Sequence, residues 1–206
     1  NRMPSTANQQ PAPGQTQPLS TERVSSSIPK AGADGADATW SYPSPQMFWN
    51  ALVRKGKAAG STEADMDTVI AIHNNMNELT WMQVLAWEAL HPPPPGAARA
   101  RLPPDAAEPK RLNFIGRPHE LTFRAQMRQA LGAAKPFDRH DWVVDRSGQK
   151  VRYIIDYYHD NSKADGDMVP ALRDKGAVRS IAIDVRPALD SVEALLDRWG
   201  YMPLAR

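Results

Sequence analysis

Apolar residues recur at helical spacing along residues 63–89, the longest patterned stretch of the chain. The recurring apolar positions are Met66, Val69, Ile70, Trp81, Val84 and Leu85. Thr62 and Asp65 have the spacing of a capping box, which satisfies free backbone N–H groups at the start of a helix. His91 precedes a proline, and the residue before a proline is biased away from helical conformation. The pattern therefore predicts one long helix from residue 63 to about residue 89.

Three shorter stretches also have the pattern of helices. Ser44 can cap a helix over residues 46–55, with Pro45 at its first position, where the missing N–H is not needed. Residues 119–131 form an amphipathic, arginine-rich stretch, and a last helix is predicted to start at Pro187.

Between these last two helices the period of the pattern changes. Residues 141–145, 149–157 and 179–185 are rich in Val, Ile, Trp and Tyr with partial alternation, which is typical of strands. Residues 146–149 supply the turn of a hairpin. We therefore predict an α+β domain in which a small antiparallel sheet of about three strands packs with several helices.

Two segments have too few large apolar side chains to build a core. Residues 1–37 are mostly Pro, Gln, Ser, Thr, Ala and Gly and are predicted to be a flexible, disordered tail, within which residues 20–30 are expected to dock on the body. Residues 92–111 are predicted to be a mobile Pro/Ala-rich insertion in a domain that spans residues 38–206. The chain begins at Asn1 rather than Met, so a missing N-terminal piece is expected.

The composition narrows the chemistry. With no cysteine among its 206 residues, the chain has no disulfide, zinc thiolate site, iron–sulfur cluster or cysteine nucleophile, and any heme it bound would be held non-covalently. The net charge of +2 at pH 7 gives no reason to expect nucleic acid as a partner. No apolar run approaches the roughly 20 residues of a membrane-spanning helix.

His73 is the first candidate for chemistry, because it lies on the apolar face of the long helix. A lone histidine in such a place is most often a packed core residue. Here Asn74, Asn75 and Asn77 crowd the same turn although asparagine is a poor helix former, and local conflicts of this kind are typical of functional sites. A neutral imidazole on a rigid helix is also a common axial ligand of heme iron. Glu78 either orients His73, pairs with an arginine, or is a solvated helix charge.

Residues 136–142 form a second candidate, with two acids, an arginine and a histidine in seven positions. The carboxylates and His140 could hold a metal ion, or an Asp–Arg pair could stabilise the turn. Arg139, His140 and Arg146 could instead donate hydrogen bonds to heme propionates, since arginine suits carboxylates in general.

Trp40 and Tyr42 are a third candidate. They lie in an extended segment bounded by prolines rather than on a helix face. Such residues often belong to a core, but flat rings beside a loop also suit a flat ligand such as a porphyrin.

Six segments of the chain, taken together and in order, resemble those of the holocytochrome c synthases, or cytochrome c heme lyases. They are residues 42–50 (YPSPQMFWN), 72–78 (IHNNMNE), 87–91 (WEALH), 136–142 (PFDRHDW), 151–158 (VRYIIDYY) and 184–190 (DVRPALD). The resemblance implies a lyase that binds heme b, its substrate, non-covalently and forms thioether bonds between the heme vinyl groups and the cysteines of the C-x-x-C-H segment of apocytochrome c. It implies a location in the mitochondrial intermembrane space, peripheral on the inner membrane.

The resemblance also implies roles for particular residues. His73 matches the axial ligand of heme iron, and Trp40 and Tyr42 match residues of the heme pocket. His140 matches a histidine tied to heme handling, and Glu78 and Arg146 match residues of the same functional region. The sequence departs from many members in having no Cys-Pro motif near its start and Ser147 where a cysteine is common.

Two other classes of function remain open at this point. A heme carrier that does not catalyse attachment would share His73 but would need no groove for a C-x-x-C-H peptide. A structural module with a metal at residues 138–141 would bind zinc or a similar ion and no porphyrin.

Overall fold

The computed structural model describes residues 8–32, 38–91, 109–146, 148–163, 169–174 and 178–200. The strands are β1 (Ser25–Pro29), β2 (Thr39–Ser41), β3 (Lys110–Gly116), β4 (Asp138–Arg146), β5 (Gln149–His159) and β6 (Ile181–Pro187). The helices are α1 (Pro45–Arg54), α2 (Met66–Glu88), α3 (Phe123–Ala130) and α4 (Val192–Gly200), and a short 3-10 helix, η2 (Glu63–Asp65), precedes α2. None of the helices in these ranges is both long and apolar enough to cross a membrane.

The main sheet is antiparallel throughout, with its strands in the order β3-β4-β5-β6. β4 and β5 form the predicted hairpin, in which Arg146 pairs with Gln149 and Trp142 with Tyr153. Gly148 has φ +94° in the turn, a conformation that side chains rarely adopt. The α+β class is thereby confirmed.

The predicted number of about three strands was too low, because the sheet has four and β1 and β2 form a separate two-stranded ribbon. β3 was missed because its ladder is irregular between Arg111 and Asn113, which breaks the alternation that reveals a strand. β3 begins at Lys110, inside the predicted insertion 92–111, and residues 92–108 of that insertion lie outside the described residues.

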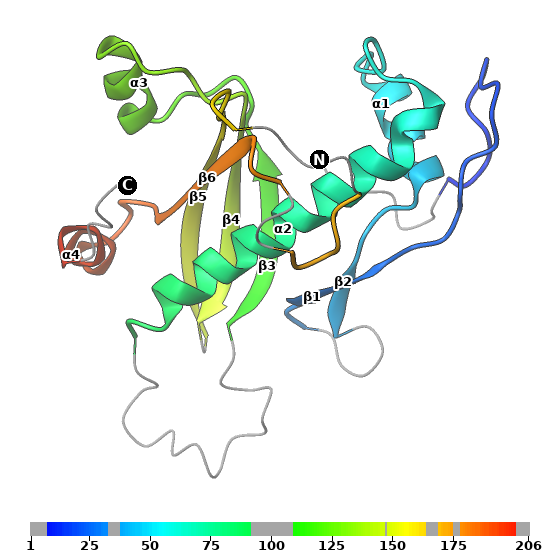
Figure 1. Ribbon diagram of the computed structural model, residues 1–206. Helices are drawn as coiled ribbons and strands as arrows, with labels where there is room; N and C mark the ends of the chain where they lie inside the picture. The colour runs from blue at the N-terminus through cyan, green and yellow to red at the C-terminus, as the bar shows by residue number, and fades with distance from the viewer. Residues whose placement is uncertain are drawn as a thin grey trace.

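Helix α2 lies across one face of the sheet, as Figure 1 shows. The C-terminal half of α2 packs against the sheet and forms the hydrophobic core with it. The core residues are Ile28, Trp81, Val84, Trp87, Trp142, Val144, Tyr153, Ile155, Tyr157 and Val185. Successive side chains of a strand point to opposite faces, so every second residue of β4 and β5 belongs to this inner face. The indole N–H of Trp87 donates to the carbonyl of Val185 at 2.8 Å, which ties α2 to strand β6.

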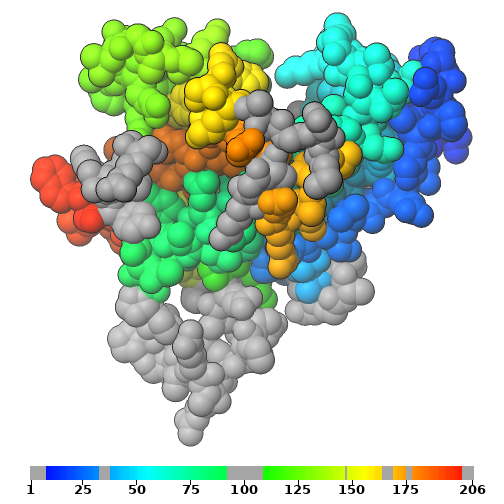
Figure 2. Space-filling model, viewed as in Figure 1, coloured from blue at the N-terminus to red at the C-terminus, as the bar shows by residue number. Residues whose placement is uncertain are grey.

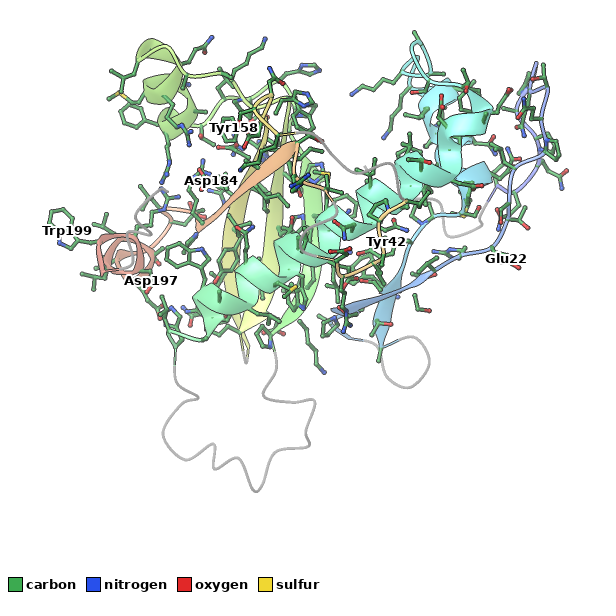
Figure 3. The ribbon with its side chains drawn as sticks, in the orientation of Figure 1. Glu22, Tyr42, Tyr158, Asp184, Asp197 and Trp199 are labelled. Carbon is green, nitrogen blue, oxygen red and sulfur yellow. The ribbon has the colours of Figure 1, made fainter. Side chains whose placement is uncertain are left out.

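The opposite face of the sheet is built from charges rather than apolar groups. Asp156 and Arg186 are almost fully buried there and form an ion pair, and the hydroxyl of Thr122 joins both. Thr122 also caps α3 by accepting from the N–H of Ala125, which explains why this helix starts at Phe123 rather than at residue 119. Figure 3 shows Tyr158 and Asp184 beneath α3 on this side.

Helix α1 lies at the N-terminal end of α2, and the ribbon β1–β2 lies beside the middle of α2 (Figure 1), where Ser26 and Ser27 donate to Glu78. Residues 20–30, which were expected to dock on the body, contain β1, and Lys30 forms a bridge to Arg111 of β3. The chain before β1 lies along α1, as the blue and cyan atoms of Figure 2 show. There the Asn50 side chain donates to the carbonyls of Asn8 and Gln10 at 3.1 and 2.9 Å. The ribbon therefore brings Trp40 and Tyr42 toward both α2 and the sheet.

Candidate functional site

His73 lies on α2, two turns before the residues that pack on the core of the sheet. Its Nδ1 is 3.2 Å from the side-chain oxygen of Asn74, and Asn77 donates to the His73 carbonyl at 2.8 Å. An amide oxygen can only accept, so these partners assign the proton of the neutral ring to Nδ1. The Asn77 amide nitrogen is 3.4 Å from Nε2, a weak contact, so the lone pair of Nε2 is the one available to a metal.

The environment of His73 favours this neutral form. Burial lowers the pKa of the imidazole, the hydrogen bond that it donates to Asn74 opposes this, and the charges of His140 and Arg111 lower the pKa further. The rings of Phe48 and Tyr42 lie 5.4 and 6.4 Å from the imidazole, centre to centre. A neutral, oriented imidazole among aromatic rings is what an axial ligand of a metalloporphyrin requires.

Glu78 is almost fully buried and joins α2 to the ribbon. Its carboxylate accepts from the hydroxyl of Ser26 at 2.6 Å, from the N–H and hydroxyl of Ser27, and from the phenol of Tyr42 at 2.9 Å. Burial alone would raise the pKa of Glu78, but these hydrogen bonds hold it below its ordinary value. Among the residues that the structure describes, its cationic neighbour is Arg173 at 3.6 Å. Glu78 therefore positions Tyr42 and the ribbon rather than the His73 ring.

Tyr42 is held as a neutral donor by the same contact. Burial, followed by the charge of Glu78, raises the pKa of its phenol, although the hydrogen bond to Ser26 opposes the rise. Figure 3 shows Tyr42 between the ribbon and α2. Tyr42 and Glu78, which the sequence presented as separate candidates, are thus joined by a direct hydrogen bond.

Trp40 belongs to a cluster that the sequence reading missed, centred on Arg111. The guanidinium carbon of Arg111 lies 4.1 Å from the Trp40 ring centre, 4.7 Å from that of Trp142 and 5.1 Å from that of Phe114. Each such contact is worth about 0.5–2 kcal/mol, whereas removing a cation from water costs several kcal/mol. The three ring contacts together are worth about 1.5–6 kcal/mol, so they offset much of the burial cost but supply no counter-charge.

The sequence offered one signal for Arg111. Residues 112–115 are Leu, Phe and Ile with a single polar residue, Asn113, which is compatible with a strand, but the preceding prolines made an insertion the simpler interpretation. Arg111 itself is indistinguishable from a surface arginine until the strand pairing is known.

His140 lies on the inner face of β4, the same face as Trp142. Its Nε2 is 3.2 Å from a carboxylate oxygen of Asp138, its ring lies 5.5 Å from Tyr157 and 6.1 Å from Phe114, and its Nδ1 is buried without a partner. Gly116 is opposite His140 in the ladder, and a Cβ there would lie 3.6 Å from the ring. His140 therefore borders the same region as Arg111 and lies close enough to His73 to affect its pKa.

The metal interpretation of residues 138–141 finds no support in the described part of the chain. No group of three or more His, Asp or Glu residues there is arranged to hold a metal ion. The physical reason is the alternation of the strand: Asp138 and His140 point to the inner face and Asp141 to the outer face.

Arg139 points to the outer face for the same reason. It donates to the Asp141 carboxylate at 3.0 Å and to the Glu120 carbonyl at 3.1 Å. The structure thus separates Arg139 from its neighbour His140, and the proposed role of Arg139 toward a heme carboxylate has no geometric support from this arrangement.

Arg146 lies at the other end of the inner face. It forms a two-point ion pair with Glu88 at 2.6 and 3.0 Å, and the phenol of Tyr153 donates to the same carboxylate at 2.5 Å. Glu88 is fifteen residues beyond His73 on α2, about 22 Å at 1.5 Å per residue. The structure therefore does not bring Arg146 together with His73.

We expect Arg146→Ala to lower the free energy of unfolding by about 3 kcal/mol, because it leaves the buried Glu88 carboxylate without its cation. Urea denaturation followed by circular dichroism measures this. The heme affinity of the folded variant is expected to stay within about twofold of the wild type, since the site is remote. Weaker heme binding at unchanged stability would instead support the heme-contact role predicted from the sequence.

Comparison with known proteins points to a single protein family. A family model described as cytochrome c/c1 heme lyase matches residues 1–202. The holocytochrome c-type synthase of Gallus gallus is 46% identical over 201 residues, which cover 96% of this chain and 64% of that protein. The protein of the same name from Bos taurus is 44% identical over 194 residues, covering 93% and 62%. The holocytochrome-c synthase of Saccharomyces cerevisiae is 36% identical over 219 residues, covering 96% and 72%.

The chain thus spans slightly less than two thirds of the length of these two vertebrate relatives. No solved structure matches it.

Proposed function

The chain belongs to the cytochrome c/c1 heme lyase family, and we propose that it acts as a holocytochrome c synthase that binds heme and joins it to apocytochrome c. The observation that carries the proposal is His73, a neutral imidazole whose Nδ1 is engaged by Asn74 and whose Nε2 lone pair is left for iron. The proposed heme site also includes Trp40, Tyr42 and His140, which lie near His73 or near Arg111.

The reaction adds each cysteine thiol across one vinyl group of the heme b substrate. The S–H bond breaks, a carbon–sulfur bond forms at the vinyl carbon next to the ring, and the hydrogen goes to the terminal vinyl carbon, so no electrons are gained or lost. His73 fixes the heme on one face, and the histidine of the C-x-x-C-H segment takes the other face and sets both thiols beside the vinyl groups. Holding reactants at near-attack distance supplies several kcal/mol of the barrier reduction.

The partners of the proposed reaction are heme and the N-terminal segment of apocytochrome c. Relatives named as synthases occur in animals and fungi, which supports a mitochondrial setting. We place the reaction in the intermembrane space, at the surface of the inner membrane, where heme and apocytochrome c meet.

The proposal is tested with purified protein loaded with heme under reducing conditions and mixed with a C-x-x-C-H peptide. We expect a peptide whose mass has increased by one heme that acidic organic solvent does not extract. A matched peptide with both cysteines replaced by alanine is expected to bind and to release all of its heme on extraction.

The alternative of a heme carrier predicts a different result from the same experiment. A carrier would show bound heme by absorption spectroscopy, but all heme would be extracted from both peptides. That outcome would refute catalysis while leaving heme binding intact.

A further inference from the structure

Arg111 differs from the other buried arginines of the sheet. The residue is only 4% exposed, its Nε is buried without an acceptor, and it forms no ion pair within 4 Å with any residue that the structure describes, although the charge of Glu78 acts on it from farther away. Arg139 and Arg186 are equally buried, but each has a carboxylate partner, Asp141 and Asp156 respectively. A buried charge without a counter-ion is rare, because such a charge is normally paired or neutralised.

The position of Arg111 is fixed from several sides. Its backbone pairs with Val144 in the ladder of β4, and its carbonyl accepts from Ala31 at 3.2 Å beside the ribbon. Trp40, Trp142 and Phe114 surround the guanidinium. The indole N–H groups of Trp40 and Trp142 are also buried without an acceptor. Three donor groups of one cluster are thus left without partners among the residues that the structure describes.

This cluster adjoins the proposed heme site. The ring of Phe114, whose centre is 5.1 Å from the Arg111 guanidinium carbon, lies 6.1 Å from the ring of His140, and the ring of His140 lies 5.5 Å from that of Tyr157. Burial lowers the pKa of Arg111 itself to about 10, so the group remains a cation at neutral pH. An anion that reached the cluster would find a preformed site with unsatisfied donors and aromatic walls.

Heme brings two carboxylates on an otherwise flat, apolar ring. We propose that Arg111 binds a propionate carboxylate of the heme, with the indole N–H groups of Trp40 and Trp142 as supporting donors, and so sets how the heme is turned about the His73–iron axis. The inference rests on the proposed function, and it gives the site a specificity for the carboxylate edge of the substrate. An acidic side chain of the peptide substrate carries the same carboxylate chemistry, and the experiment distinguishes the two sources.

The experiment compares heme with heme dimethyl ester, whose carboxylates are blocked, in titrations monitored by the Soret band. The proteins are wild type, Arg111→Met, which keeps the length and packs against aromatic rings, and Arg111→Lys, which keeps the charge. Arg117→Met, which changes the residue just after the last residue of strand β3, is the matched control. Wild type is expected to bind the ester about 10- to 100-fold more weakly than heme, as for loss of a charge-assisted hydrogen bond.

In Arg111→Met we expect heme and its ester to bind equally within about threefold, both near the wild-type affinity for the ester. Arg111→Lys is expected to keep part of the wild-type preference for heme over its ester. The control variant Arg117→Met is expected to keep all of it. The melting temperature of Arg111→Met is expected to equal or exceed that of wild type without heme, because an unpaired buried charge is removed.

An unchanged ester penalty in Arg111→Met would overturn the role of Arg111 while leaving heme binding and the proposed function standing. A second outcome would also overturn the propionate role of Arg111. If wild type bound heme and its ester equally well, and Arg111→Met bound the C-x-x-C-H peptide more weakly, Arg111 would be assigned to a carboxylate of the peptide. A wild-type protein that binds neither heme nor its ester would overturn both proposals.

Discussion

Replacing His73 by alanine is expected to abolish stable heme binding and, with it, thioether formation. Loss of an outer partner of a metal ligand typically costs 10- to 100-fold in affinity, so loss of the ligand itself is expected to cost at least about 100-fold. The measurement is the Soret band of protein purified after expression with added heme, together with the yield of heme-linked peptide. Both are expected to fall to the background level.

Two controls isolate the ligand role of His73. His159→Ala removes an exposed imidazole that stacks on Phe137, 4.2 Å away between ring centres, and is expected to leave the Soret band unchanged. Free imidazole is small enough to enter the space left in His73→Ala and is expected to restore part of the band. A wild-type Soret band that keeps its position and intensity in His73→Ala would refute the assignment of the axial ligand.

The long helix could be predicted from sequence because several signals agreed. The capping box at Thr62 and Asp65 is present, and the helix ends near the proline run as expected. Its apolar periodicity also placed His73 on the inward face. Such agreement between local propensity, capping and pattern is what makes an element predictable.

The residues around Arg111 could not be predicted in the same way. A strand is recognised by alternation, and the irregularity between Arg111 and Asn113 removes it. What makes Arg111 unusual is that no carboxylate in the described part of the chain forms an ion pair with it, which is a property of the three-dimensional arrangement and not of any residue near it in sequence. The role of Glu78 was hidden for a related reason, since its donors, Ser26, Ser27 and Tyr42, lie 36 to 52 residues away along the chain.

The cluster at residues 136–142 shows how the period of a strand bears on a predicted site. Arg139 and His140 were treated as one group because they are adjacent. Once the segment is assigned to a strand, adjacent side chains must point to opposite faces, and a joint role toward one ligand becomes implausible. The period of the element decides which neighbours in sequence are neighbours in space.

Glu78→Gln is expected to lower the free energy of unfolding by about 2–4 kcal/mol near neutral pH. Hydrogen bonds to a charged acceptor are worth more than neutral ones, and a glutamine amide would place N–H groups against the donors of Ser26, Ser27 and Tyr42. Loosening the ribbon also displaces Trp40 and Tyr42, so weaker heme binding is expected as well. Urea denaturation of the heme-free protein measures the change in unfolding free energy separately from the change in heme binding.

The pH dependence of this effect tests its cause. The pKa of Glu78 is lower in the folded protein than its ordinary value of 4.5, so the folded state binds its proton less readily than the unfolded state. The stability from the carboxylate is therefore complete above pH 4.5 and is lost as the pH falls through the folded-state pKa. The difference in unfolding free energy between wild type and Glu78→Gln is accordingly expected to shrink as the pH falls below 4.5.

Glu63→Gln provides the matched control, because Glu63 accepts from the N–H and hydroxyl of Thr16 at the protein surface, at 3.0 and 2.9 Å. Its effect on stability is expected to stay below about 1 kcal/mol, as for exposed polar contacts. If Glu78→Gln proved as mild as Glu63→Gln, the carboxylate could not be what holds the ribbon against α2. The placement of Trp40 and Tyr42 would then have to come from the core contacts of β1 and from the stacking of Trp40 on Arg111.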